Sequence, residues 1–133
     1  MDLAPVTITR LIAAARAAQA AAYAPYSHFP VGAAVLAEDG RIFIGCNVEN
    51  SSYGLTVCAE RNAIGAAIVA GARPTAVAVV AEEPGISPCG ACRQVLSEFA
   101  PDMPVILADR AGLSQQVTAL DTLLPGAFHL ATS

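Results

Sequence analysis

Three cysteines and one glutamate, in two short segments 31 positions apart, are the residues of this sequence best suited to chemistry. The first segment is Cys58 with Glu60 two positions later, and the second is Pro88 followed by Cys89 and Cys92. Three thiolates hold a zinc ion and leave its fourth position open, as in catalytic zinc sites. A nearby carboxylate that does not bind the metal is then available to move protons. The spacing therefore predicts a catalytic zinc site with Cys58, Cys89 and Cys92 as ligands and Glu60 as the proton shuttle.

The charge of such a site must be compensated, because three thiolates on Zn²⁺ leave a net charge of about −1. Both metal segments are predicted to begin helices, and the positive end of a helix stabilises a thiolate. Arg61 and Arg93, each directly following a residue of the two segments, supply further positive charge. We expect Arg61 to compensate the thiolate charge, and a solvent-exposed surface position is the alternative for both arginines.

Three other interpretations of these residues have to be weighed. Cys89 and Cys92 alone could form a redox pair at the start of a helix. Glu60 alone could be a first-turn glutamate favoured by the helix dipole. A structural zinc would require a fourth protein ligand. The candidates for that ligand are Cys46, His28 and His129. The occurrence of Cys58 and Glu60 together with the second segment favours the catalytic interpretation over all three.

Substrate-binding residues are predicted from the end of a strand and from two aromatic side chains. Asn47 and Glu49 alternate along the end of the strand expected over residues 41–48, so their side chains point to one face. An amide and a carboxylate placed in this way bind a hydroxyl group, and a polar strand end in contact with solvent is the alternative. Phe29 and Phe128 could each stack on a planar base, although burial in the core explains either residue at least as well.

The elements that must position these residues alternate between helices and strands. Apolar residues at helical spacing predict a first helix from about residue 5 to residue 22. A β-hairpin follows, with its turn at Asp39 and Gly40. Further expected elements are helices over 58–70 and 89–99, strands over 75–81 and 104–108, and a weaker fifth strand near Val117. This order predicts a mixed sheet covered by helices on both faces.

Composition limits the remaining possibilities. The 133 residues fit one domain, and the 55% that are apolar predict a dense core or buried subunit interfaces. The net charge is −4 and the basic residues are scattered, so a small free substrate is expected and a nucleic acid is not. No uninterrupted apolar run approaches the roughly 20 residues of a membrane span. The Cys-x-x-Cys pair favours a metal site with reduced thiols over disulfides, and hence a cytoplasmic protein.

Beyond these motifs, the chain resembles the small zinc-dependent cytidine deaminases of the homotetrameric type. The matching segments are residues 24–34, 45–50, 58–61, 87–96 and 123–128, which cover most of the chain in order. The resemblance implies a three-layer α/β/α fold with a five-stranded mixed sheet, in one catalytic domain over residues 1–133. It also implies one zinc ion per chain, a homotetramer, and hydrolysis of cytidine and 2′-deoxycytidine to uridine and 2′-deoxyuridine with release of ammonia, as in pyrimidine salvage.

The same resemblance implies roles for individual residues. The residues that match the family's zinc ligands and its proton shuttle are Cys58, Cys89, Cys92 and Glu60. Asn47 and Glu49 match residues that hold the ribose 3′-hydroxyl. The backbone N–H of Ala59 is expected to meet the base carbonyl, and Phe29 is expected to pack on the base. The residues expected to reach into the site of a neighbouring subunit are Tyr53 and Phe128.

Other functions remain as alternatives. A blasticidin-S-type deaminase shares the Cys-Ala-Glu and Pro-Cys-Gly-x-Cys-Arg-Gln segments but lacks the Cys-Asn-Val-Glu-Asn segment in this form. The intact Asn47 and Glu49 therefore favour a nucleoside substrate. A non-catalytic zinc-binding module would bind zinc and leave cytidine unchanged, and the intact Glu60 argues against it. The acidic net charge argues against a deaminase that acts on polynucleotides.

Overall fold

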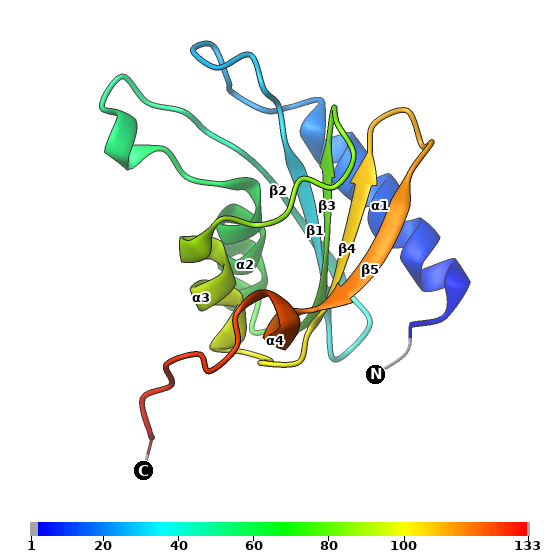
Figure 1. Cartoon of the computed structure of the whole chain (residues 1–133), viewed down its shortest axis with the longest axis vertical. Coiled ribbons are helices and arrows are strands. Elements are labelled where there is room, and N and C mark those ends of the chain that lie inside the picture. The colour runs from blue at the N-terminus through cyan, green and yellow to red at the C-terminus, as the bar shows by residue number, and fades with distance from the viewer. Residues whose placement is uncertain (1–2, 133) are drawn as a thin grey trace.

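A five-stranded mixed sheet forms the centre of the computed structural model, which describes residues 3–132 (Figure 1). The strands lie in the order β2-β1-β3-β4-β5. Their bounds are Gly32–Ala37 for β1, Ile42–Cys46 for β2, Pro74–Ala81 for β3, Pro104–Asp109 for β4 and Gln115–Ala119 for β5. Strands β3 and β4 are parallel, and the other three neighbouring pairs are antiparallel. The predicted mixed sheet, including its fifth strand near Val117, is confirmed.

Helices cover both faces of this sheet and give the three layers that the resemblance implied (Figure 1). Helix α1 (Pro5–Gln19) lies on one face, and α2 (Ala59–Val69) and α3 (Gly90–Ser97) lie side by side on the other. Alternate residues of β3 join the buried cluster under α1 and the buried cluster under α2 and α3. Strands β3 and β4 are thus buried on both faces, as their continuous runs of β-branched residues and alanine predict.

Two glycines allow the helices to approach the sheet closely. A Cβ atom on Gly32 in β1 would overlap the carbonyl oxygen of Ala15 in α1. A Cβ atom on Gly45 in β2 would lie 2.6 Å from the carbonyl oxygen of Ala59, at the start of α2. Neither position has room for a side chain, so glycine is required there. The close contact at Gly45 fixes the height of Cys58 and the first turn of α2 above the sheet.

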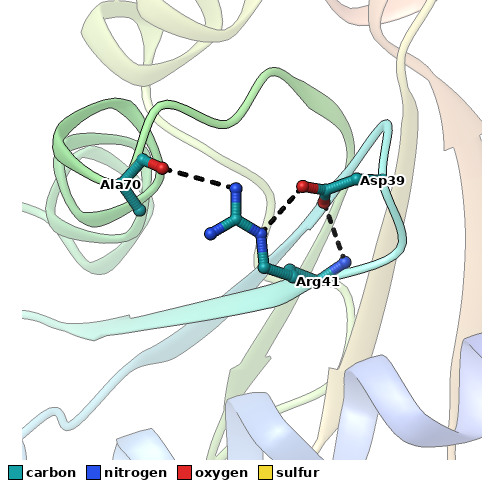
Figure 2. Close-up of polar contacts among 3 residues, drawn as sticks. All are labelled: Asp39, Arg41 and Ala70. Atoms are coloured by element: carbon teal, nitrogen blue, oxygen red, sulfur yellow. Dashed lines mark hydrogen bonds and ion pairs between the residues drawn. The ribbon is translucent and has the colours of Figure 1, made fainter.

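The hairpin between β1 and β2 turns at Asp39 and Gly40, as predicted, and is tied to the far end of α2 (Figure 2). Gly40 has a φ of +88°, which glycine adopts without strain. The backbone N–H and the Nε of Arg41 donate to the Asp39 carboxylate at 3.1 and 2.8 Å, and a second guanidinium nitrogen donates to the Ala70 carbonyl at 3.3 Å. Because Ala70 is the C-cap of α2, Arg41 holds the end of this helix that lies farthest from Cys58.

The C-terminal end of α1 comes earlier than the sequence predicts. The helix ends at Gln19 rather than near residue 22, because residues 20–22 form tighter turns before Tyr23 donates to the Asn47 carbonyl at 3.0 Å. Two short elements have no counterpart in the prediction. They are the 3₁₀ helix η1 (Tyr53–Leu55) and helix α4 (Leu120–Leu123).

Strand β2 is also shorter than predicted. It ends at Cys46 rather than at Val48, because Val48 leaves the sheet and forms isolated bridges with Tyr23 and Val57 instead. These bridges still fix the backbone on both sides of Asn47, although this residue no longer belongs to a strand.

Among residues 3–132, no helix combines the length and the apolar character needed to cross a membrane. The longest helix, α1, has 15 residues, whereas a span needs about 20.

Candidate active site

The three predicted zinc ligands lie together at the N-terminal ends of α2 and α3. The sulfur atoms of Cys58, Cys89 and Cys92 all lie within 4.8 Å of one another, and those of Cys58 and Cys89 are 3.9 Å apart. Tetrahedral zinc with Zn–S bonds of about 2.3 Å places its sulfur ligands about 3.8 Å apart. The three thiols therefore fit one zinc ion. In the part of the chain that the structure describes, no candidate for a fourth protein ligand joins this cluster.

The helix ends present these thiols in a way that keeps them available to a metal. Cys58 is the N-cap of α2 and Cys89 is the N-cap of α3, and neither side chain forms the capping hydrogen bond that is usual at this position. Cys92 lies in the first turn of α3 and is buried. The free N–H groups and the dipoles of both helix ends favour negative charge on the sulfur cluster.

Arg61 contacts the sulfur cluster directly. Its guanidinium donates to Sγ of Cys58 at 3.5 Å. Hydrogen bonds, first from Cys92 and then from Arg61, lower the pKa of Cys58 to about 5. The pKa of Cys92 is raised, first because its thiol donates to Cys58, and the bonds to the cysteines raise the pKa of Arg61. The cluster therefore holds thiolate charge, and Arg61 lies where it can compensate that charge.

Glu60 lies in the first turn of α2, and its side chain is only 5% exposed. Burial first, and then the charge of the neighbouring Cys58, raise the pKa of Glu60 to about 7. A carboxyl group with a pKa near neutral both accepts and gives up protons at physiological pH. Among the described residues, the side chains close enough together to hold one metal ion are those of the three cysteines. Glu60 is not one of them, so its carboxyl remains available for proton transfer.

A cavity of about 190 Å³ opens onto these groups. The residues that line it are Val31, Asn47, Thr56, Cys58, Ala59, Glu60, Val79, Ile86, Ser87 and Cys89. Two metal ligands, the proton-transfer group, the first residue of α2 and one predicted hydroxyl-binding residue thus meet around a single space. This convergence makes the cavity the candidate active site.

A second, larger cavity of about 350 Å³ lies beside the C-terminal end of α1 and is not the candidate site. Gln19, His28, Glu82 and Arg110 are among the residues that line it, and none of the three metal ligands does. Glu82 and Arg110 form an exposed ion pair of 3.1 Å, which neutralises the charge there. We assign the reaction to the smaller cavity because the groups able to do chemistry converge in it.

Asn47 connects the candidate site to the loop over residues 24–30. Its Oδ1 accepts a hydrogen bond from the Val31 backbone N–H at 2.9 Å, and its Nδ2 donates to the Phe29 carbonyl at 3.0 Å. The side chain is half-buried and lines the cavity. One N–H of the Asn47 amide remains available to a ligand, since the two bonds use one donor and one acceptor.

Glu49 binds the same loop but does not line the cavity. Its carboxylate accepts hydrogen bonds from the backbone N–H groups of Tyr26 and Ser27 at 2.9 and 3.2 Å, and from the Ser27 hydroxyl. The Ser27 hydroxyl first, and then the two backbone groups, lower the pKa of Glu49, so this carboxylate is charged at neutral pH. The side chains of Asn47 and Glu49 therefore face one loop, and a role for the pair in hydroxyl binding remains a proposal.

The three predicted aromatic contacts lie outside the cavity. Phe29 is half-buried in the loop over residues 24–30. Tyr53, in η1, is 87% exposed, and Phe128, in the segment after α4, is 71% exposed. None of the three lines the cavity of its own chain. Their predicted roles are therefore taken up below as proposals.

The guanidinium of Arg93 binds oxygen atoms rather than the thiols. It donates to the carbonyl oxygens of Pro88 and Leu123 at 2.8 and 2.7 Å, and to the Ser87 hydroxyl at 2.9 Å. Arg93 therefore binds the main chain beside Cys89, and it is neither a thiolate partner nor a freely solvated surface arginine.

Sequence reasoning did not single out several residues of the cavity wall. These residues are Val31, Thr56, Val79, Ile86 and Ser87. Thr56 and Ser87 stand two positions before Cys58 and Cys89, and this proximity could have indicated them. The three apolar residues resemble any others of the core by type, so no sequence signal separates them.

Comparison with known proteins agrees with this geometry. Residues 6–108 match the family described as the cytidine and deoxycytidylate deaminase zinc-binding region. A cytidine deaminase of Sporosarcina psychrophila is 53% identical over 124 residues, which cover 91% of this chain and 90% of the relative. A cytidine deaminase of Halalkalibacterium halodurans is 50% identical over 121 residues, which cover 89% of this chain and 91% of the relative.

A solved structure gives the same result for the fold. The 1.6 Å crystal structure of cytidine deaminase from Burkholderia pseudomallei is similar with a TM-score of 0.85 and 52% identity. The match covers 90% of this chain and 98% of that one. Since about half of the residues are identical over nearly the whole length of each relative, this chain belongs to the cytidine deaminase family.

Proposed function

We propose that this protein catalyses the hydrolytic deamination of cytidine and 2′-deoxycytidine, which yields uridine or 2′-deoxyuridine and ammonia. The observation that carries the proposal is the buried Glu60 carboxyl, with a pKa of about 7, beside three thiols that fit one zinc ion. A zinc ion held by these thiols supplies Lewis-acid chemistry by lowering the pKa of water. Relatives named cytidine deaminase support a cytosine nucleoside as the substrate.

Glu60 moves the protons of this reaction. The replacement of an amine by water requires a proton to be taken from the attacking water and a proton to be given to the leaving amine. A carboxyl group whose pKa lies near neutral performs both transfers in turn. Its burial in the first turn of α2 favours the protonated form, which keeps the group ready to act as an acid.

Other residues of the site orient the base and balance charge. The backbone N–H of Ala59, at the first position of α2, has no acceptor within its own helix, and we assign it to the base carbonyl. Phe29, in the loop that Asn47 holds, packs on the base in this proposal. Arg61 compensates the thiolates through its contact with Cys58.

The activity itself can be tested with four compounds. Metal-replete protein is mixed separately with cytidine, 2′-deoxycytidine, cytosine and blasticidin S, and the loss of ultraviolet absorbance is followed. We expect turnover of the two nucleosides alone. Turnover of blasticidin S without turnover of cytidine would replace the proposal by a blasticidin-S-type deaminase, and bound zinc without any turnover would make the chain a zinc-binding module.

We further propose that Asn47 and Glu49 bind the ribose 3′-hydroxyl. Both side chains face one loop beside the cavity, and both retain unused hydrogen-bonding capacity. An unpaired buried polar group costs about 1–3 kcal/mol. Steady-state kinetics should therefore show that the analogue 3′-deoxycytidine is used with a catalytic efficiency roughly 10- to 100-fold below that for cytidine.

Glu49→Ala should reduce the difference in catalytic efficiency between cytidine and 3′-deoxycytidine, because the variant lacks the carboxylate that binds the 3′-hydroxyl. 2′-Deoxycytidine serves as the matched control, since it lacks a different hydroxyl of the same ring. If wild-type protein used cytidine and 3′-deoxycytidine with equal efficiency, the assignment of Asn47 and Glu49 would be wrong.

We also propose that the active protein is a homotetramer whose sites are completed by neighbouring subunits. The cavity of about 190 Å³ is smaller than the roughly 300 Å³ at the lower end for small-molecule sites, so one chain provides only part of the wall. Tyr53 and Phe128 are large, mostly exposed aromatic residues that lie outside this cavity. Contact with a second copy would remove both from water and add them to the neighbour's site.

A dilution series tests the assembly. Sedimentation and specific activity, measured on the same samples, are expected to fall together as the tetramer dissociates. Phe128→Ala is expected to raise KM, because the base would lose a contact from the neighbouring subunit. An active monomer would exclude shared sites, whereas a tetramer in which Phe128→Ala turns over normally would exclude a role for that side chain alone.

The four cysteines support a reducing location. Among the described residues, all four are free thiols, and zinc binding requires three of them to stay reduced. We therefore place the protein in the cytoplasm and treat residues 1–133 as one catalytic domain.

A further inference from the structure

We propose that Arg93 is a positioning residue of the zinc site, which fixes the turn that carries Cys89 and fastens this turn to the C-terminal segment. The inference rests on the zinc site of the proposed function. It adds a residue that touches neither the three sulfur atoms nor the cavity.

The guanidinium of Arg93 uses three of its nitrogens at once. Nε donates to the Pro88 carbonyl at 2.8 Å, one terminal nitrogen donates to the Ser87 hydroxyl at 2.9 Å, and the other donates to the Leu123 carbonyl at 2.7 Å. The side chain is half-buried, so water competes weakly for these bonds. Three short bonds from one planar group fix the relative position of the three acceptors.

The first two acceptors belong to the turn that delivers a zinc ligand. The Pro88 carbonyl shares its peptide plane with the nitrogen and Cα of Cys89, so a fixed carbonyl also fixes the two backbone atoms from which the Cys89 side chain is positioned. Cys89 is exposed and makes no capping bond, and packing therefore does not hold its thiol in place. Ser87 also lines the cavity, so the same guanidinium supports part of the cavity wall.

The third acceptor belongs to the C-terminal segment. Leu123 is the last residue of α4, and the chain then runs past α3 toward its C-terminus (Figure 1). Gln94, the next residue of α3, donates from Nε2 to the Phe128 carbonyl at 3.0 Å. Two consecutive side chains of α3 thus hold both ends of the segment Leu123–Phe128. The helix that carries Cys92 also positions the aromatic residue that we propose for a neighbouring site.

The positioning role proposed for Arg93 differs from the charge-compensating role of Arg61. Arg61 contacts a sulfur atom, whereas every hydrogen bond of the Arg93 side chain goes to oxygen. Lysine keeps the positive charge but lacks the planar fork, and one ammonium cannot replace three donors that point in different directions. Arg93→Lys and Arg93→Gln are therefore expected to be impaired to a similar degree.

The test compares zinc release from four variants. Zinc-loaded wild type, Arg93→Lys and Arg93→Gln are mixed with a colorimetric chelator, together with Arg41→Lys and Arg41→Gln as matched controls. Arg41 also donates to a backbone carbonyl, at the other end of α2 (Figure 2). We expect both Arg93 variants to release zinc 10- to 100-fold faster than wild type and both Arg41 variants to release it at the wild-type rate.

Two further measurements separate positioning from general stability. The visible spectrum of the cobalt-substituted protein should change in both Arg93 variants, because it reports the geometry of the thiolate ligands. With cytidine, kcat should fall because Cys89 is displaced, and KM should rise less than in Phe128→Ala, because Gln94 still binds the Phe128 carbonyl. Wild-type release from Arg93→Lys beside fast release from Arg93→Gln would show a charge role and overturn the proposal. Equally fast release from the Arg41 variants would overturn it too.

The test remains decisive in two other situations. If Arg93→Gln does not fold, the comparison of Arg93→Lys with Arg41→Lys decides. If wild-type protein retains zinc but does not deaminate cytidine, the proposed function fails, and the ratio of zinc release rates still decides the role of Arg93.

Discussion

Replacing Glu60 with glutamine is expected to reduce kcat by roughly 10²- to 10⁴-fold while the protein keeps its zinc. Glutamine has nearly the same shape as the glutamate but cannot accept and return a proton. Among the described residues, Glu60 is not part of the cysteine cluster that could hold a metal, so the three thiols should bind zinc in the variant as in the wild type. The measurement is kcat with cytidine, paired with elemental analysis of the same preparation. Near-normal turnover with full zinc content would show that another group shuttles the proton.

The stability of Glu60→Gln provides the control against misfolding. The pKa of Glu60 is raised from 4.5 to about 7 in the folded protein, so the folded state binds the proton more tightly than the unfolded state. The ionised carboxylate therefore costs the wild type stability as pH rises from 4.5 toward 7, and the cost is complete above that range. Glutamine avoids this cost. The variant should be at least as stable as wild type near pH 8, with a smaller difference near pH 5.

The clustering of Cys58, Cys89 and Cys92 beside Glu60 could be predicted from sequence because it depends on local features. Apolar residues at helical spacing follow both Cys58 and Cys89, Pro88 directly precedes Cys89, and both cysteines are N-caps in the structure. The strands that precede the two helices, β2 and β3, lie on either side of β1, and both helices cover the same face of the sheet, where their N-terminal ends meet. Three thiols from two helix starts leave little freedom for a different site.

Contacts with the distant main chain could not be predicted in this way. The Leu123 carbonyl, which binds Arg93, lies 30 residues along the chain, and a backbone carbonyl has no residue-type signature. The sequence predicts that Glu49 binds a hydroxyl near the end of a strand, but it gives no sign that Tyr26 and Ser27 bind the Glu49 carboxylate. The bound loop is 22 residues away in sequence, and only the folded chain shows that it lies there.

Replacing any of the three zinc-binding cysteines with alanine is expected to remove both zinc and stability. Each replacement leaves only two thiols, whereas a catalytic zinc site uses three protein ligands. Because metal binding free energy is also folding free energy, we expect the unfolding temperature to fall by roughly 10 °C or more. Elemental analysis and thermal unfolding of freshly purified protein measure the two effects. Wild-type protein is expected to contain one zinc ion per chain.

The three cysteine variants differ in how much they disturb packing. This difference separates the contribution of zinc to stability from the contribution of packing. Cys92 is fully buried, so its replacement also leaves a small gap in the core, whereas Cys89 is exposed and its replacement alone should change stability by less than about 0.5 kcal/mol. A large loss of stability in Cys89→Ala therefore reports the missing zinc. Cys46→Ala is the matched control, because this half-buried thiol lies outside the cluster and should leave zinc and activity unchanged. Full zinc content in Cys89→Ala, or wild-type protein purified without zinc, would refute the three-cysteine site.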